Sequence, residues 1–290
     1  MSDTSLALPA EAPARANRRA GLMRSLETWV PRVLTWVLLG FLFVPMLVVI
    51  PVAFTDRSYL SMPVDGLSMQ HFRALADPSK GWIGSILTSA VIGVVSALSC
   101  TALAAAFSIG AWLHAGRWPS LMRVILLSPL IVPPIIYAVG MVRLWSALSL
   151  LDTWFGNIII HVILAMPLAV LAISGALGNL DPAVVRAARS LGARPPMIVT
   201  GVILPNLRAG LAASLLLSFI VSWDEITVTL FVTSRNIVTL PRRIWTSIND
   251  NVDPAIAAIA SLMLLITVLG LLARLLIWDR RGAEKTNHNN

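Results

Sequence analysis

The sequence predicts an all-α protein that crosses a membrane six times. Hydrophobic residues make up 57% of the 290 residues and charged residues only 12%, and the mean hydropathy is +0.81. A soluble chain of this length cannot bury so much apolar surface, so much of that surface must face lipid. A bilayer core about 30 Å thick needs roughly 20 mostly apolar residues per helical span. Six stretches meet this requirement: 33–54, 83–112, 121–147, 155–177, 207–232 and 256–278.

The 22 lysine and arginine residues indicate how the chain is oriented. A net charge of +8 and a pI near 11.1 would suggest a nucleic-acid partner for a soluble protein. Here the basic residues lie in short segments between apolar stretches, which is the positive-inside pattern of a membrane protein. With the N-terminus inside, fifteen of the 22 fall on the cytoplasmic side and seven on the other. We therefore expect both termini in the cytoplasm and no nucleic-acid partner.

This orientation divides the chain into three parts. Residues 1–31 are predicted to form a cytoplasmic N-terminal tail, residues 32–279 the transmembrane domain, and residues 280–290 a cytoplasmic C-terminal tail. Leu22, Leu26 and Trp29 recur at helical spacing, so the end of the first tail is expected to form a short amphipathic surface helix.

Prolines and small residues predict how the spans pack. Proline leaves a backbone carbonyl unpaired in a helix, so the spans that contain proline should kink and face other helices or a water-filled path. These prolines are Pro51, Pro129, Pro133, Pro134 and Pro167. The second span is rich in Gly, Ala and Ser, which predicts tight packing against neighbouring helices or a second subunit.

The cytoplasmic loop between the fourth and fifth spans, residues 178–205, is long, basic and suited to form a helix. Asp181 is a good N-cap, Pro182 suits the first helical position, and Gly192 suits a helix end. Such a helix would present Ala187, Ala188 and Leu191 to a partner rather than to lipid. Because alanine is small, the partner surface could approach the helix backbone closely.

This loop resembles the coupling loop of permease subunits of ATP-binding-cassette importers. That family carries Glu-Ala-Ala, then three residues, Gly, nine residues and Ile-x-Leu-Pro. The positions here are Arg186, Ala187, Ala188, Gly192 and Val202-Ile203-Leu204-Pro205. Arg186 stands where the family has glutamate, so a charge-specific contact of that glutamate is not carried over, whereas docking by shape is. The resemblance implies that the residues coupling the chain to an ATPase are Arg186, Ala187, Ala188, Leu191, Gly192, Leu204 and Pro205.

Residues 218–225, Phe231-Val232-Thr233 and Thr239-Leu240-Pro241 are similar to the second permease of the spermidine/putrescine subgroup. Relatives that import other amines, amino acids or phosphonates share this pattern. The resemblance implies a multi-pass protein of the bacterial inner membrane. It also implies a second permease, with a heterodimer expected, two ATP-binding subunits that carry ATP and Mg, and an extracytoplasmic solute-binding protein.

Asp224 and Glu225 are adjacent carboxylates in an otherwise apolar stretch. An ionised group at such depth costs on the order of 3 kcal/mol, so it normally faces a cavity or a partner. We expect one or both to contact a cationic solute, and we expect aromatic side chains to line its path through cation–π contacts. The aromatic candidates are Tyr137, Phe219 and Trp223.

The sequence leaves other interpretations of these residues open. The two carboxylates could instead pair with Arg143 or Arg235 or sit in interfacial water, and the aromatic rings could face lipid. His161, in the fourth span, is expected to form hydrogen bonds between helices rather than to relay protons. Cys100 is expected to be a small packing residue.

Motifs for enzymatic chemistry are absent from the sequence. It has no Gly-x-x-x-x-Gly-Lys-Ser/Thr phosphate loop, no His-Glu-x-x-His and no Gly-x-Ser-x-Gly. We therefore expect no catalytic residues, no metal site and no cofactor bound by this chain, and ATP hydrolysis in a separate subunit. The rival classes are an ion-gradient-driven secondary transporter, which would need internal repeats that the halves do not show, and a passive channel or scaffold. Only the importer predicts a stoichiometric ATPase partner.

Overall fold

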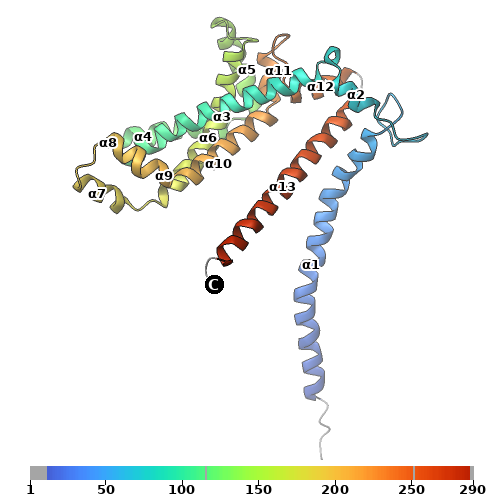
Figure 1. Ribbon diagram of the computed structural model, residues 1–290, viewed down its shortest axis with the longest axis horizontal. Helices are drawn as coiled ribbons and strands as arrows, with labels where there is room; N and C mark the ends of the chain where they lie inside the picture. The colour runs from blue at the N-terminus through green and yellow to red at the C-terminus, as the bar shows by residue number, and fades with distance from the viewer. Residues whose placement is uncertain (1–11, 115, 251, 288–290) are drawn as a thin grey trace, which may run out of the picture. The chain divides into compact units, whose positions relative to one another are not determined.

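The structure is a computed structural model that describes residues 12–114, 116–250 and 252–287. These residues form helices and connecting loops and include no β-strand (Figure 1). They divide into two compact units, one made of Met1–Phe72 with Pro254–Asn290 and the other of Arg73–Asp253. The predicted all-α class is therefore confirmed.

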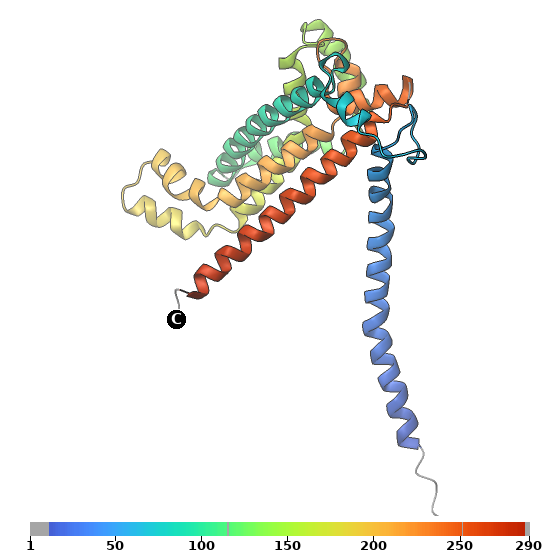
Figure 2. The same cartoon turned by 45° about the vertical axis from the view of Figure 1, so that its right-hand side comes forward.

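The first unit is built on two long helices, α1 (Ala12–Ala53) and α13 (Ala255–Asn287). They meet near one end, where the Ser261 hydroxyl donates to the Val49 carbonyl at 3.3 Å, and they diverge from there (Figure 2). The segments Trp29–Ala53 and Ala255–Arg274 are long and apolar enough to cross a membrane. They correspond to the first and last predicted spans.

Both long helices extend beyond the predicted span limits. A separate amphipathic helix was expected before Pro31, but α1 continues without interruption from Ala12. Proline at position 31 does not break the helix, although it removes one backbone donor. Similarly, α13 runs to Asn287, beyond residue 279, where the C-terminal tail was predicted to begin. Residues 1–11 and 288–290 of the predicted tails lie outside the described residues.

The second unit has a core of three helices that pack on one another, α3 (Trp82–Leu113), α6 (Trp154–Gly178) and α10 (Arg208–Asp224). Small residues let these helices approach closely, as the second predicted span suggested. In α3, Ser96, Ala97, Cys100 and Ala104 are fully buried. The Cys100 thiol donates to the Val162 carbonyl of α6 at 3.7 Å, which confirms its packing role.

The third of the six predicted spans is sharply bent. The third consists of α4 (Arg117–Leu127) with the 3-10 turn Ser128–Leu130, and then α5 (Pro134–Ala147), at an angle of 106°. Pro133 and Pro134 stand at the N-cap and first position of α5, where proline is favoured, so they break the span rather than kink it. Pro167, in contrast, lies inside the continuous helix α6. Four straight spans and two bent pairs together give up to six.

The other bent pair joins the segment Pro195–Asn206 to α10 at 71°. That segment contains α8 (Pro195–Ile198), a π-helical turn (Val199–Ile203) and α9 (Leu204–Asn206). At its other end α10 stops at Asp224, and the short helix α11 (Thr227–Val232) follows. The predicted fifth span, 207–232, is therefore interrupted at the acidic pair.

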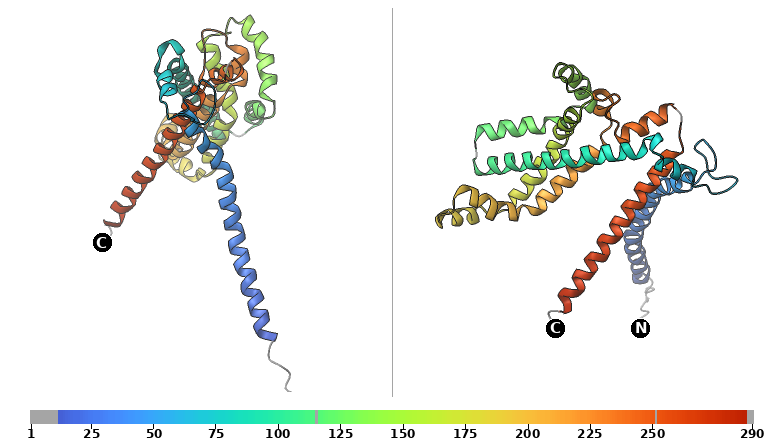
Figure 3. Two further views of the ribbon diagram at one scale, coloured as in Figure 1. Left: turned by 90° about the vertical axis from the view of Figure 1, so that its right-hand side faces the viewer. Right: turned by 45° about the horizontal axis from the view of Figure 1, so that its top comes forward.

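Short elements lie at the two ends of the three-helix core (Figures 1 and 3). Helices α7 (Pro182–Ser190), α8 and α9 lie at one end. Helices α5, α11 and α12 (Leu240–Asp250) lie at the opposite end, where α3 begins. The remaining elements are α2 (Gln70–Ala76) and the 3-10 turn Pro78–Lys80.

Candidate functional site

The predicted coupling helix is present as α7, and its ends have the expected chemistry. The Asp181 carboxylate accepts a hydrogen bond from the Ala183 N–H at 2.8 Å, which satisfies one of the free donors at a helix start. Pro182 occupies the first helical position. Gly192 has φ of +82°, a left-handed conformation that favours glycine and ends many helices. The prediction of this helix and of both its caps is confirmed.

One side of α7 packs on the chain and the other side is exposed. Val185 is buried, and Ala188 packs against the same hydrophobic core cluster. On the other side Val184 is 47% exposed and Leu191 is 88% exposed, with Ala187 exposed between them. Ala188, which was expected to face a partner, therefore contacts the chain's own core. The remaining side chains form a small apolar surface without a covering group among the described residues.

The other predicted coupling residues differ in whether they contact the core. Leu204 packs against the core cluster, whereas Pro205 and Arg186 are exposed. Leu207, immediately after this segment, is fully buried, and its carbonyl accepts from the Leu211 N–H of α10 at 2.8 Å. The segment that follows α7 thus leads directly into α10, so a displacement of α7 has a short covalent path to the core.

The acidic pair lies at the break between α10 and α11. Asp224 is the last residue of α10 and is exposed, and Glu225 has an extended backbone. The Glu225 carboxylate accepts from the Val228 N–H at 2.7 Å, so it caps the start of α11. A carboxylate at a helix start is favoured by the unpaired N–H groups there. The break therefore places Asp224 at the end of α10 and Glu225 between the two helices.

Three aromatic candidates lie near this break. Phe219 and Trp223, on the last turns of α10, stack with ring centroids 5.6 Å apart. Gly93 of α3 makes room for this stack, because a Cβ there would lie 2.9 Å from the Phe219 ring. Tyr137 comes from α5 and packs against a buried cluster that includes Val228 and Val232 of α11. The structure therefore places the acidic pair, Phe219 and Trp223 on consecutive turns, and Tyr137 beside the helix that Glu225 caps.

His161 connects both sides of the break to α6. Its Nδ1 lies 2.6 Å from the Ser222 hydroxyl of α10, and its Nε2 lies 3.1 Å from the Thr229 hydroxyl of α11. The side chain is fully buried. The expected role of hydrogen bonding between helices is confirmed. The alternative of an ion pair for the acidic residues is not supported, because within the described residues neither Arg143 nor Arg235 pairs with either carboxylate.

Asp152 is a site residue that the sequence did not reveal. It lies in the loop between α5 and α6 and accepts four backbone hydrogen bonds of 2.8–3.1 Å, from the N–H groups of residues 234–237. Burial raises the pKa of Asp152, but these four N–H groups lower it by more, so the pKa lies below its ordinary value. The donors are backbone groups more than 80 residues away, so no local pattern marks this acceptor.

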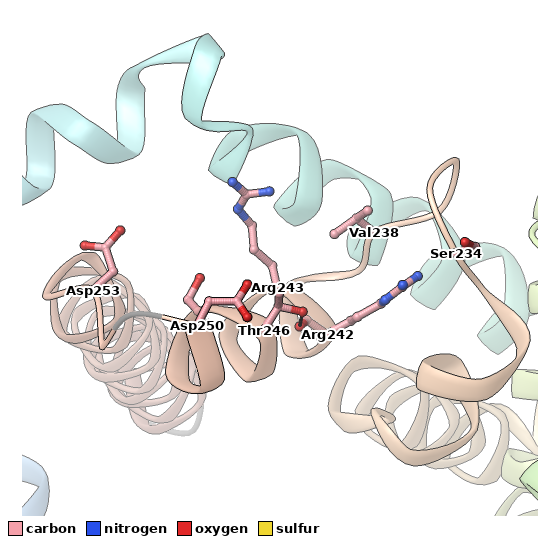
Figure 4. A pocket seen from close by; sticks show the side chains of 8 residues that line it. Ser234, Val238, Arg242, Arg243, Thr246, Asp250 and Asp253 are labelled. Carbon is pink, nitrogen blue, oxygen red and sulfur yellow. Dashed lines mark hydrogen bonds between the residues drawn. The ribbon is translucent and has the colours of Figure 1, made fainter.

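A pocket of about 430 Å³ lies between α12 and the segment that precedes it, which contributes Ser234 and Val238 (Figure 4). Its two arginines point in different directions. Arg242 donates to the Thr233 hydroxyl at 2.5 Å and to the Ile237 carbonyl at 3.0 Å, and Arg243 donates to the Lys80 carbonyl and lies over the Trp82 ring. Burial lowers the pKa of Arg242, while the nearby charge of Asp152 raises it. Both arginine side chains therefore bind neighbouring parts of the chain and stabilise the fold around the pocket.

The described helices could cross a membrane up to six times, and comparisons with known proteins identify the family. The chain belongs to the family of binding-protein-dependent transport system inner membrane components, whose model matches residues 100–281. This membership favours a permease of an ATP-binding-cassette importer over an ion-gradient-driven transporter.

Relatives match over nearly the whole chain. The spermidine/putrescine transport system permease protein PotC of Haemophilus influenzae is 23% identical, over 87% of this chain and 96% of the relative. The putrescine transport system permease protein PotI of Escherichia coli is 26% identical, over 78% of this chain and 83% of the relative. In fold, the chain is similar to one from a bacterial ABC transporter involved in the import of the acidic polysaccharide alginate. That match has a TM-score of 0.62 and 19% identity, and covers 92% of this chain and 98% of the other.

Proposed function

We propose that this chain is one permease subunit of an ATP-driven importer for a polyamine-like cation. The observation that carries the proposal is the capped helix α7, which presents Val184, Ala187 and Leu191 as an exposed apolar surface within a permease of this family. Such a surface on a cytoplasmic helix suits a neighbouring ATPase. The positive-inside distribution supports a cytoplasmic position for α7 and both termini, with 1–31 and 280–290 as the cytoplasmic tails and 32–279 as the membrane domain.

The partners follow from this arrangement. Two ATPase subunits, which bind ATP and Mg, dock on α7 and its counterpart in a second permease, and an extracytoplasmic binding protein delivers the solute. When the ATPases close, they push on the coupling residues Arg186, Ala187, Leu191 and Gly192. Because the following segment leads into α10, this push shifts the spans between inward-open and outward-open states. Ala188 and Leu204 keep α7 attached to the core, whereas Pro205 is exposed.

The nature of the solute is inferred from two observations. Two relatives that match most of this chain are named for spermidine and putrescine. An acidic pair also lies beside stacked aromatic rings at the α10 break. Asp224 and Glu225 would attract an alkylammonium group, while Phe219, Trp223 and Tyr137 would contact its methylene chain and ammonium ends. The fold alone does not decide the solute, since a similar fold serves import of an acidic polysaccharide.

Purification and uptake test the two parts of this proposal separately. The chain, purified from its native membrane, is expected to bring down an ATPase in stoichiometric amount. In proteoliposomes that contain the whole complex and its binding protein, labelled spermidine or putrescine should enter only with ATP. Asp224→Asn and Glu225→Gln should reduce uptake at least tenfold, whereas Asp65→Asn, an exposed carboxylate that pairs with Arg57, should not. Unchanged uptake in both variants would remove the acidic pair from the path.

A further inference from the structure

Helix α11 is held at both ends by polar contacts that come from other elements. It has only six residues and a length of about 9 Å at 1.5 Å per residue. A helix this short is not stable by itself, so its position depends on what holds it. Its N-terminal end is fixed by Glu225, which caps it, and by His161, which contacts Thr229.

The C-terminal end of α11 is held by Asp152. The Asp152 N–H donates to the carbonyl of Val232, the last residue of α11, at 2.8 Å. The Asp152 carboxylate then accepts from the N–H groups of Ser234, Arg235, Asn236 and Ile237. Asp152 thus forms hydrogen bonds with the chain on both sides of Thr233. Asp152 itself has φ of +53°, a conformation that aspartate tolerates better than most residues.

Arg242 holds the same end from α12. Its Nη1 donates to the Thr233 hydroxyl and to the Ile237 carbonyl. The Thr233 hydroxyl in turn donates to the Thr229 carbonyl at 2.7 Å, and the Thr229 hydroxyl lies 3.5 Å from the Glu225 carbonyl. A series of polar contacts therefore runs along one face of α11, from Arg242 through Thr233 and Thr229 to the Glu225 carbonyl.

We propose that Asp152 and Arg242 are positioning residues that hold the C-terminal end of α11 and thereby fix the Glu225 carboxylate for contact with the solute. The inference rests on the proposed function, because it gives Glu225 a role in the path. Neither residue contacts the solute. They act through α11: if its C-terminal end is released, the helix moves, and the Val228 N–H that holds the Glu225 carboxylate moves with it.

Three variants test the clamp, by which we mean the contacts of Asp152 and Arg242 with residues 232–237, and each variant has a matched control. Asp152→Asn keeps the size of the side chain but replaces one acceptor oxygen with a donor, which opposes the two N–H groups that this oxygen binds. Its control is Asp77→Asn, an exposed carboxylate that accepts only from Ser79. Thr233→Val removes the hydroxyl that joins Arg242 to Thr229, and Thr233→Ser keeps it. Arg242→Gln is compared with Arg235→Gln, whose side chain is exposed.

The first measurement is hydrogen exchange of the purified complex. Asp152→Asn is expected to accelerate exchange of the backbone N–H groups of residues 234–237 at least tenfold and that of α11 several-fold. Thr233→Val and Arg242→Gln should accelerate exchange in α11, and the control variants should match the wild type. Exchange in α11 that is unchanged in Asp152→Asn and in Thr233→Val would overturn the proposal, whether or not the wild type transports a polyamine.

The second measurement is uptake of spermidine into proteoliposomes as a function of its concentration, together with ATP hydrolysis. The three clamp variants should need at least tenfold more solute for half-maximal uptake, while ATP hydrolysis stimulated by the binding protein persists. Thr233→Ser should restore wild-type behaviour, which a general loss of stability would not explain. Faster exchange with unchanged uptake would overturn the positioning role. A wild type that takes up no polyamine would instead contradict the proposed function, and the exchange measurement would still decide whether the clamp exists.

Discussion

Gly210 and Ala176 meet where α10 crosses α6, so closely that a Cβ at position 210 would lie 2.4 Å from the Ala176 Cβ. The same Cβ would lie 3.4 Å from the Ala172 carbonyl oxygen. Both obstacles belong to the backbone or sit directly on it, so neither can rotate away. This contact lies inside the three-helix core, close to where the segment that follows α7 enters α10.

Replacement of Gly210 by alanine is therefore expected to separate α10 from α6. Overpacking of this kind typically costs about 1–3 kcal/mol. We expect Gly210→Ala to lower the thermal unfolding midpoint of the detergent-solubilised complex and to reduce uptake. Gly110→Ala is the matched control, since nothing lies within 4 Å of a Cβ at that position of α3. Equal midpoints for the two variants would show that the close approach is not needed.

Substitutions of Gly192 are expected to act differently from those of Gly210, because position 192 is limited by its backbone conformation and not by neighbouring atoms. Its φ is +82°, and a Cβ there would have nothing within 4 Å. A left-handed backbone costs a non-glycine residue about 1–2 kcal/mol, and asparagine tolerates it best. Gly192→Val should therefore disturb the end of α7 and uncouple ATP hydrolysis from uptake, whereas Gly192→Asn should retain most coupling. The prediction is wrong if, in Gly192→Val, the binding protein still stimulates ATP hydrolysis and uptake remains coupled to it.

The features that the sequence predicted well are those that depend on neighbouring residues. Asp181, Pro182 and Gly192 each act on the backbone within two residues, so α7 and its caps could be predicted from their order alone. The apolar spans could be predicted because lipid imposes their length. Likewise, His161 lies in an apolar span where a polar ring needs a partner, so its role between helices could be predicted although its partners, Ser222 and Thr229, could not.

The features that the sequence did not predict depend on packing between distant segments. The prolines near residue 133 predicted a kink, but the local sequence did not predict the 106° angle or that α5 packs on α11. Ala188 belongs to the motif that resembles a coupling loop, yet it faces the core because Val185 and Ala188 share one side of α7. The Asp152 clamp joins a carboxylate to backbone N–H groups 82–85 residues away. Every residue except proline has a backbone N–H group, so the residue types do not show which of these groups bind a distant carboxylate.

Arg186 stands where permeases of ATP-binding-cassette importers have glutamate. We expect its substitution to change binding of the ATPase partner and not the stability of the fold. Its side chain is exposed on α7 and makes no ion pair within the described residues. An exposed substitution of this kind usually changes stability by less than about 0.5 kcal/mol. Arg186→Glu should therefore leave the unfolding midpoint unchanged but weaken binding of an ATPase surface that has adapted to a positive charge. Arg189→Glu on the same helix controls for net charge, and equal ATPase binding by wild type and Arg186→Glu would show that docking depends on shape alone.

Asp152 also predicts how stability depends on pH. Because its folded-state pKa lies below the ordinary value of about 3.9, the ionised carboxylate stabilises the folded loop at any pH above that value. This contribution is lost as the pH falls through the lower, folded-state pKa. The unfolding midpoint of the wild type should therefore exceed that of Asp152→Asn by a constant amount from neutral pH down to about pH 5, and the gap should close below about pH 4. A gap that persists undiminished in acid would mean that the variant acts through lost hydrogen-bond geometry, and that the negative charge of Asp152 does not hold the loop.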